Sequence, residues 1–331
     1  MWFRELSKDS DVVVSSRIRF ARSIVGYKFP NAISSCELSK IVKLVEDSID
    51  NKKYKLFKMK DIDEITEKSL MEQHLISKEF VGNEDGAILM NDDSTIVTMI
   101  NEEDHLRIQS FESGFNLEKC YDRLVEFTNE LNKKIEFAIN DKYGYLASCP
   151  TNVGSGMRVS VMLHLPGLYK MGLLSKILDQ ASSIGFSVRG LYGENSAGLG
   201  YMYQISNQKT LGVNDQDIIA GVEAVVATII EQERRARKVL QKNSIELEDE
   251  IYRAYGILKN ARTISDDEAM NLLSKARLGT SLGLLKETEL KKINALMIDI
   301  HSSTLKSILK EDISKEEENE KRASYIREEL K

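Results

Sequence analysis

Cysteine and proline are scarce in this chain, which has three of each and a single tryptophan among its 331 residues. The cysteines Cys36, Cys120 and Cys149 are odd in number and far apart, which argues against a disulfide framework and against the usual spacing of zinc ligands. No apolar stretch approaches the length that crosses a bilayer, and the first residues do not resemble a secretory signal. We therefore expect a cytoplasmic protein with no membrane association and no metal held by protein ligands.

An excess of positive charge is also missing, since 46 lysines and arginines stand against 52 aspartates and glutamates, for a net charge of -6. Direct nucleic-acid binding calls for a basic face, so we expect none. A chain of this length usually exceeds a single core, which predicts two domains. The composition changes after a long helical pattern, so we predict one domain over residues 1–240 and a second over residues 241–331.

Strand and helix patterns alternate irregularly through the first domain. Apolar runs predict strands at residues 12–14, 87–90, 95–100, 145–148, 157–165, 186–191 and 201–205. Helical spacing predicts helices at residues 37–49, at 117–131, after Pro166, and from an N-cap at Asn214 to about residue 241. This order favours an α+β fold, with a mainly antiparallel sheet flanked by helices, followed by an all-helical C-terminal domain.

Two charged segments fall within the predicted helices. Residues 231–238 carry a run of charged side chains, which predicts a solvated helix face and not a binding patch. Ser265 to Glu268 has the pattern of a capping box and predicts a helix start in the second domain.

Arginines occur at unusual density in four segments, at residues 15–19, 101–107, 149–158 and 189–194. Arg17 and Arg19 alternate along an extended segment, so both should point to one face. Clustered guanidinium groups repel one another unless an anion binds, and their fork geometry matches phosphate oxygens. The chain has no Gly-x-x-x-x-Gly-Lys-Ser/Thr loop. If Arg17, Arg19, Arg107, Arg158 and Arg189 converge, their side chains would clamp a polyphosphate, with magnesium held by the nucleotide.

The carboxylates Glu103 and Glu194 in these segments suit a guanidine acceptor, because two carboxylates can grip its planar N–H groups. The high pKa of a guanidinium means that the nucleophilic form needs a base. Cys149 beside arginines would tend toward the thiolate. Each segment alone also has an ordinary interpretation: an exposed strand face for Arg17 and Arg19, a solvated turn for Glu103, a buried filler for Cys149, a turn cap for Glu194, and structural roles for His74 and His105. The residues by themselves indicate an anion-binding α+β enzyme.

In combination, Asn-Glu-Glu-Asp-His-Leu-Arg at residues 101–107 and Cys-Pro-Thr-Asn-Val-Gly at residues 149–154 resemble the phosphagen (guanidino) kinase superfamily, specifically its bacterial protein-arginine kinase branch of the McsB type. The resemblance is strong from about residue 12 to residue 209. It implies a phosphagen kinase catalytic domain and transfer of the ATP γ-phosphate to a guanidinium nitrogen.

The resemblance also implies roles for single residues. Glu103 matches the catalytic carboxylate, Glu194 the second carboxylate that holds the guanidinium, and Cys149 the active-site cysteine. Nucleotide-binding segments and residues are implied at Ser15, Ser16, Arg17, Ile18, Arg19, His74, Arg107, Arg158, Val159, Ser160, Val161, Met162, Arg189, Gly190, Leu191, Tyr192, Gly193 and Glu194. ATP, with Mg²⁺ held through its phosphates, is the implied cofactor.

The protein-arginine branch is favoured because the Ser-x-Arg-x-Arg strand lies within the first twenty residues, without the helical domain that precedes it in small-molecule phosphagen kinases. An open site suits an arginine on a protein surface. The resemblance further implies a homodimer, a zinc-finger activator protein, a heat-shock repressor as target, and a Clp ATPase that receives marked clients in a stress response. Kinase action on free arginine or another small guanidine, and a non-catalytic nucleotide- or phosphoarginine-binding adaptor, are the alternatives.

One departure concerns the second domain, where the resemblance implies phosphoarginine binding and assembly. The family motif Arg-Asp-x-x-Arg-Ala corresponds here to Glu318-Asn319-Glu320-Lys321-Arg322-Ala323. An acidic residue replaces the first arginine and would repel phosphoarginine. We therefore predict that allosteric feedback through this pocket is impaired.

Overall fold

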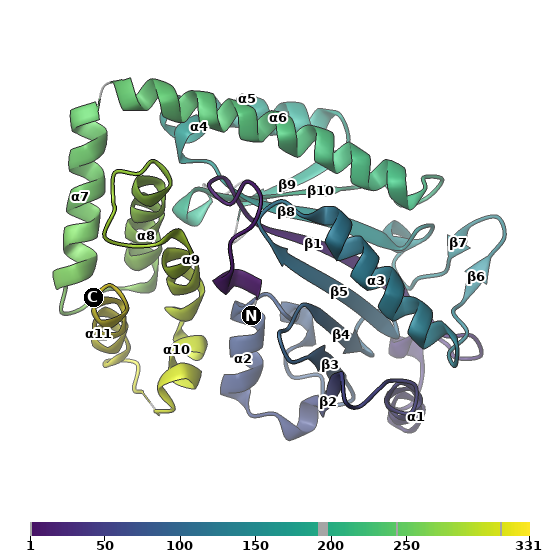
Figure 1. Ribbon diagram of the computed structural model, residues 1–331. Helices are drawn as coiled ribbons and strands as arrows, with labels where there is room; N and C mark the ends of the chain where they lie inside the picture. The colour runs from purple at the N-terminus through teal and green to yellow at the C-terminus, as the bar shows by residue number, and fades with distance from the viewer. Residues whose placement is uncertain (1, 191–197, 243, 312) are drawn as a thin grey trace.

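An eight-stranded antiparallel sheet forms the centre of the computed structural model, which describes residues 2–190, 198–242, 244–311 and 313–331. The strand order is β2-β3-β4-β5-β1-β8-β10-β9, and β6 and β7 form a separate two-stranded ribbon (Figure 1). This confirms the predicted mainly antiparallel sheet. The strands are β1 Val13–Arg22, β2 Tyr54–Lys58, β3 Ala87–Asn91, β4 Ile96–Ile100, β5 Leu106–Ser113, β6 Ile139–Asn140, β7 Gly144–Tyr145, β8 Met157–His164, β9 Phe186–Gly190 and β10 Met202–Asn207.

One face of the sheet is covered by helices. Alternate strand residues such as Ile18 and Phe20 point into this core, where they meet the apolar stripes of α1, α3 and α6. In Figure 1, α3 and the long α6 cross the sheet on this side. The helices of this part of the chain are α1 Ser35–Glu46, α2 Glu64–Glu72, α3 Leu117–Asn132, α4 Pro166–Lys170, α5 Leu174–Ser183 and α6 Asp215–Lys242.

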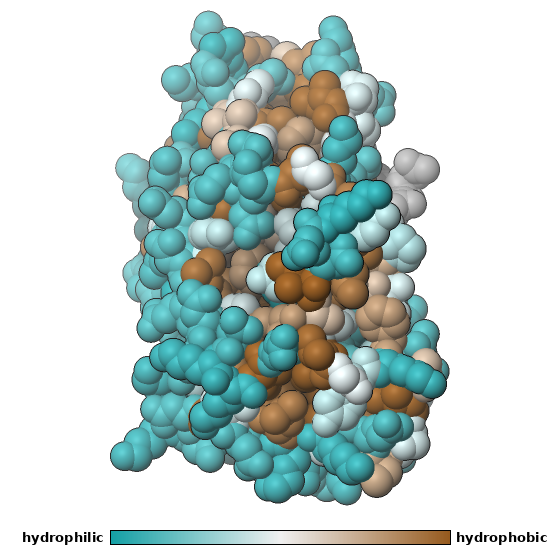
Figure 2. All heavy atoms as spheres, turned by 90° about the vertical axis from the view of Figure 1, so that its right-hand side faces the viewer, coloured by the Kyte–Doolittle hydropathy of each residue, from teal (hydrophilic) through white to brown (hydrophobic). Residues whose placement is uncertain are grey.

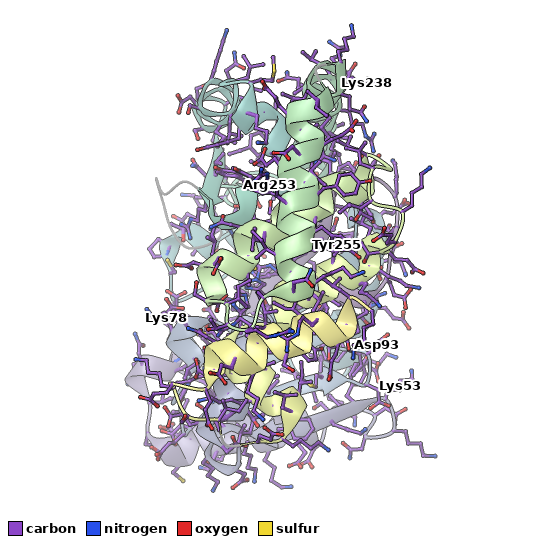
Figure 3. All side chains as sticks on the ribbon, turned by 90° about the vertical axis from the view of Figure 1, so that its left-hand side faces the viewer. Lys53, Lys78, Asp93, Lys238, Arg253 and Tyr255 are labelled. Atoms are coloured by element: carbon purple, nitrogen blue, oxygen red, sulfur yellow. The ribbon has the colours of Figure 1, made fainter. Side chains whose placement is uncertain are left out.

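The C-terminal part is helical and buries an apolar cluster made mostly of its own residues. This cluster also takes in Met202 and contacts Val14 and Met162, so the helical part is packed directly on the sheet. Figure 3 shows α7 upright on this side of the molecule, with Arg253 and Tyr255 on it and α11 crossing below. The helices are α7 Ser244–Asn260, α8 Asp266–Ser281, α9 Leu290–Asp299, α10 Ser302–Leu309 and α11 Glu318–Glu329.

Most predicted local signals correspond to real elements. The hairpin of β3 and β4 forms as predicted. The N-cap at Asn214 also forms, with its Oδ1 accepting from the Asp217 N–H at 2.8 Å. Ser265 likewise caps α8 by accepting from the Glu268 N–H at 3.3 Å. The predicted strand at residues 145–148 is wrong beyond Tyr145, because the Ser148 N–H bonds the Asp104 side chain at 2.6 Å instead of a neighbouring strand.

The charge run at residues 231–238 is not only a solvated face, which corrects the sequence prediction. Glu233 is fully buried, where its carboxylate accepts from the backbone N–H groups of Gly167 and Leu168 at 2.8 Å each. Arg237 is also buried and pairs with Glu233 at 2.6 Å. This side of α6 therefore fastens the start of α4, and only the other side faces water.

Candidate active site

A row of arginines lies on the sheet face opposite the helix-covered core. Strand alternation puts Arg17 and Arg19 of β1 on this face. The antiparallel register then places Arg19 directly opposite Arg158 of β8, and Arg17 opposite Ser160. Cross-strand partners lie close enough for their side chains to interact, so the register brings together cations that are far apart in the sequence.

These side chains line a cavity of about 340 Å³. Arg17 is held in place by Ser160 and Gln204, each at 3.2 Å. Arg158 donates to the Ser206 hydroxyl at 2.9 Å, while its buried Nε meets no acceptor among the described residues. The described residues that line the cavity are Ser15, Arg17, Arg19, His74, Phe111, Arg158, Ser160, Met162, Arg189, Gly190 and Gln204. None of these described residues carries a carboxylate.

The electrostatics of this cavity favour an anion. Burial lowers the pKa of Arg17 to about 9, and the nearby charges of Arg107 and Arg158 add to the shift. The pKa of Arg19 is lowered well below its usual range, first by burial and then by the charges of Arg107, Arg17 and Arg158. Cations that are desolvated and repel one another are stabilised by a bound polyanion. The cavity is therefore suited to a ligand with several negative charges.

Not every residue of the predicted nucleotide segments reaches the cavity. The side chains of Ser16, Ile18, Val159 and Val161 are buried away from it, on the opposite face. Three of them belong to the apolar core, and the Ser16 hydroxyl donates to the Gly114 carbonyl at 2.8 Å. A strand turns successive side chains to opposite faces, so only every second side chain of these segments points into the cavity. Gln204 and Phe111 were missed, although alternation along their strands could have indicated them.

Arg107 is paired within the protein. It forms an ion pair with Glu102, which also accepts from the Ser77 hydroxyl. Burial alone would raise the pKa of Glu102, but Arg107, Ser77 and Arg19 outweigh it and lower that pKa. Glu102 is thus an ionised anchor for Arg107, which is not among the described residues that line the cavity but whose charge acts on Arg17 and Arg19. Sequence analysis did not single it out, because a run of three acidic residues does not reveal which one turns inward.

Glu103 and Cys149 lie side by side, where the charge of Arg107 acts on Glu103. Burial, Asp104 and Glu102 raise the pKa of the Glu103 carboxyl, while a hydrogen bond with Cys149 opposes the rise. The Cys149 thiol also lies 3.1 Å from the Thr151 hydroxyl. Asp104 joins the two segments, because it accepts from the Ser148 N–H at 2.6 Å. The structure therefore places an exposed carboxylate with weakened acidity beside a thiol.

The loop after Cys149 is fixed in place by close backbone contacts. Gly154 has a φ of +113°, and a side chain there would meet the Thr210 carbonyl oxygen at 2.3 Å. The Thr210 hydroxyl in turn bonds the carbonyls of Thr151 and Val153, at 2.8 Å each. Arg22, stacked on Tyr145 at 3.6 Å, donates to the Ser155 carbonyl. This loop is consequently a rigid connection between Cys149 and Arg158.

The two histidines of the predicted segments differ. His74 lines the cavity, and burial, Arg17 and His301 lower its pKa to about 4, so it is neutral near pH 7. His105 is structural, as expected from the residues alone: its Nδ1 accepts from the Ile24 N–H and its Nε2 donates to the Lys28 carbonyl, both at 2.9 Å.

The remaining predicted residues, Leu191, Tyr192, Gly193 and Glu194, lie outside the described residues. Within the described ranges no group of three or more His, Cys, Asp or Glu side chains could hold a metal ion. Nor does any helix found there combine the length and apolarity needed to cross a bilayer.

A second, open groove of about 780 Å³ lies beside Gly154 and Ser155, between the β6–β7 ribbon and the start of α6. Apolar side chains are exposed around it, including Ile139, Tyr143 and Leu211. Figure 2 shows apolar side chains gathered among polar ones on the side of the molecule where β6 and β7 lie.

Comparison with known proteins gives two family matches that together span most of the chain. Residues 37–236 match the family described as ATP:guanido phosphotransferase, C-terminal catalytic domain. Residues 244–331 match the family described as Protein-arginine kinase McsB C-terminal domain. A protein-arginine kinase of Clostridium acetobutylicum is 41% identical over 337 residues, covering 100% of this chain and 99% of that protein. Another, from Bacillus cereus (strain AH187), is also 41% identical and covers 100% of this chain and 95% of that protein.

Solved structures share the fold. The duplicated taurocyamine kinase from Schistosoma mansoni, with bound transition state analog components, is 30% identical with a TM-score of 0.62. The match covers 70% of this chain and 35% of that duplicated protein. A lombricine kinase structure has a TM-score of 0.61 at 23% identity, with 70% of each chain covered, which shows the fold alone.

Proposed function

Since the chain belongs to the protein-arginine kinases of the ATP:guanido phosphotransferase family and is a phosphotransferase, we propose that it transfers the ATP γ-phosphate to guanidinium groups of arginine residues in proteins. The observation that carries the proposal is the cavity in which Arg17, Arg19 and Arg158 face one another from adjacent strands. Their charges match a triphosphate, and no glycine-rich phosphate loop is needed.

In this proposal ATP occupies the arginine cavity. Arg17, Arg19, Arg158 and Arg189 bind its phosphates, and Arg107, oriented by Glu102, adds a further cation close to Arg17 and Arg19. Mg²⁺ enters with the nucleotide, since the described residues offer no cluster of metal ligands. Neutralising the phosphate oxygens and fixing the γ-phosphate are what phosphoryl transfer chiefly demands.

Glu103 acts as the base in the transfer step. A guanidinium nitrogen of the acceptor gives a proton to the Glu103 carboxylate. The lone pair left on that nitrogen then forms the N–P bond with the γ-phosphorus. The bond between the γ-phosphorus and the bridging oxygen breaks, and ADP leaves with that electron pair. The raised pKa of Glu103 makes it a stronger base than an ordinary carboxylate. Cys149 orients Glu103 through their hydrogen bond, and we assign Glu194 to the grip on the acceptor.

A protein acceptor is favoured over free arginine by the groove beside the Gly154 loop. The exposed Ile139, Tyr143 and Leu211 of this groove offer apolar surface to a polypeptide near Cys149. A small guanidine is too short to contact this surface. Turnover on free arginine and on an unfolded protein, measured side by side, distinguishes the two acceptors.

We further propose the division into a catalytic domain, residues 1–240, and a helical domain, residues 241–331, because α7 to α11 bury a largely separate apolar cluster. The impaired phosphoarginine pocket predicted for the second domain also stays part of the proposal. Glu318 is paired with Lys306 at 3.0 Å, and Arg322 is buried and donates to the Ile300 carbonyl at 2.9 Å. Both groups have internal partners, which supports a structural role at this site.

The cellular role belongs to the proposal as well. We propose a cytoplasmic homodimer that marks clients for Clp-dependent degradation in a stress response, with a zinc-finger activator protein and a heat-shock repressor among its partners. The family resemblance supports this role, and co-purification from the source cells with and without stress tests it.

The activity is tested by incubating the full chain with MgATP and an arginine-rich unfolded protein, followed by mass spectrometry for phosphoarginine. We expect acid-labile phosphate on arginine residues. Glu103→Ala should lower the rate by about a hundredfold or more, the usual contribution of a general base.

A matched control is Glu79→Ala, a change at an exposed carboxylate in the segment before β3. It should leave the rate unchanged. Nucleotide binding without any phosphate transfer would favour the adaptor alternative, and full activity of Glu103→Ala would exclude Glu103 as the base.

A further inference from the structure

His74 lies in the wall of the arginine cavity in a backbone conformation that needs support. Its φ of +61° is uncommon for a residue with a side chain. It directly follows the C-cap of α2, where the Leu75 N–H bonds the Leu70 carbonyl at 2.9 Å. The position of His74 therefore depends on where the end of α2 is held.

The end of α2 is held by the helical C-terminal part of the chain. The Glu72 carboxylate accepts from the backbone N–H groups of Ser303 and Thr304, at 3.1 and 2.7 Å, and from the Thr304 hydroxyl at 2.8 Å. The N-cap residue of α10, His301, makes no side-chain capping bond. Glu72 thus caps α10 from another helix and meets N–H groups that lack helical partners.

A second contact reinforces the same junction. The Gln73 amide donates to the Ser69 hydroxyl at 2.9 Å, and Ser69 donates to the Thr304 hydroxyl at 3.2 Å. All three hydroxyl and amide side chains are buried. The last turn of α2 and the first turn of α10 therefore form one hydrogen-bonded unit.

The junction of α2 and α10 also lies close to the arginine cavity. A smaller cavity of about 50 Å³ shares Ser15, His74 and Met162 with the arginine cavity, and its other wall comes from the helical part, including Met297 and His301. His301 is buried and bonds Asp266 at 3.0 Å. His74 consequently stands between the candidate nucleotide site and the helices after residue 260.

We propose that Glu72 is a positioning residue that holds His74 in the nucleotide site through the N-terminus of α10, so that nucleotide binding depends on the helical C-terminal domain. This rests on the proposed function, because it assigns the arginine cavity to ATP. Glu72 touches no ligand in this scheme and acts through the backbone of the residues that follow it.

The test compares three variants of the full chain. Glu72→Ala removes all three accepted bonds, whereas Glu72→Gln keeps one oxygen able to accept from α10. Asp63→Ala is the matched control, because Asp63 caps the other end of α2 with two hydrogen bonds to Thr66 and is exposed. Each variant is measured for MgATP affinity, for KM and kcat, and for its thermal midpoint.

We expect Glu72→Ala to weaken MgATP affinity and raise its KM by about fivefold or more, a change equivalent to about 1 kcal/mol. The kcat should change less than about twofold, because the transfer groups are untouched. Glu72→Gln should recover part of the affinity. Asp63→Ala should lower the thermal midpoint without changing KM.

Equal MgATP affinity in Glu72→Ala and Asp63→Ala, with an active wild type, would overturn the positioning role and leave the proposed function standing. If Glu72→Ala does not fold, the near-isosteric Glu72→Gln takes its place. A lowered thermal midpoint with an unchanged KM for MgATP in Glu72→Gln would then overturn the positioning role. A wild type that does not bind MgATP would instead overturn the proposed function, and this inference with it.

Discussion

Arginines in the cavity differ from arginines on the surface, because burial and mutual repulsion both disfavour their charged form. Arg17 and Arg19 are held on this face by the register of β1 with β8, and Arg17 also donates to Ser160 and Gln204. The charged form of Glu103, the proposed base, is disfavoured as well, although its charge has the opposite sign. Burial first, and then the two neighbouring acidic groups Asp104 and Glu102, raise the free energy of the ionised form of Glu103 and so raise its pKa. Each group is thereby poised to interact with a charge that the substrate brings.

The shifted pKa of Glu103 predicts a pH dependence of phosphate transfer. The base must be ionised, and its pKa is raised above 4.5, so kcat/KM should fall on acidification through that raised value. Below it the rate should drop about tenfold for each pH unit. Glu103→Asp, with a lower intrinsic pKa, should move the acidic limb to lower pH. An unmoved limb in that variant, with circular dichroism showing a folded protein, would assign the limb to another group.

Among the elements, α6 carries a buried ion pair that ties distant parts of the chain together. Glu233 binds the start of α4, while Arg237 donates to the carbonyls of Asp11 and His164, both at 3.0 Å. Such a pair is expensive to break, because removing one partner leaves the other charged in a dry environment. The helix is therefore held by specific polar contacts as well as by its apolar stripe.

Glu233→Ala should lower the free energy of unfolding by about 3–5 kcal/mol, the usual cost of breaking a buried pair. Denaturant unfolding followed by circular dichroism measures this. Glu231→Ala is the control two residues away, because it breaks the exposed pair of Glu231 with Arg235. Exposed pairs contribute little, so its unfolding midpoint should stay close to that of the wild type. Equal losses in the two variants would show that Arg237 is satisfied without Glu233.

At the scale of the whole molecule, the candidate site exists only in the folded state, because its cations come from strands scattered along the chain. The central position of β1 between β5 and β8 brings Arg17, Arg19 and Arg158 together. The unfolded chain carries a net charge of -6 and offers no comparable site. Binding of a polyanion should therefore stabilise the fold by mass action.

We expect MgATP to raise the midpoint of thermal unfolding, with about 2.7 kcal/mol gained at a concentration a hundred times the Kd. Inorganic tripolyphosphate should also raise it, and adenosine much less, because guanidinium groups provide most of the recognition. Added salt should weaken the effect. Arg19→Gln should reduce the shift given by tripolyphosphate. If adenosine raises the midpoint as much as MgATP does, and Arg19→Gln leaves the rise unchanged, the binding energy comes from outside the arginine cavity.

Local patterns were sufficient to predict much of the fold. The β3–β4 hairpin, the N-cap at Asn214 and the cap of α8 depend on neighbouring residues, so they could be recognised before any tertiary contact was known. Prediction was wrong where distant groups compete for the backbone, as at Ser148, or bury a charged side chain, as at Glu233. The same holds for the site: motifs indicated the segments, but not which of their side chains turn inward.

The sequence by itself determined that Arg17 and Arg19 share a face, that the chain bears arginine-rich segments beside carboxylates, and that its family motifs stand at residues 101–107 and 149–154. Only the tertiary structure decided that Arg158 faces Arg19, that Glu102 holds Arg107, and that Glu72 joins α2 to α10. The physical reason is the distance along the sequence over which each kind of interaction acts. Side-chain alternation and capping act over a few residues, whereas register, burial and pairing of charges depend on which distant segments fold against one another.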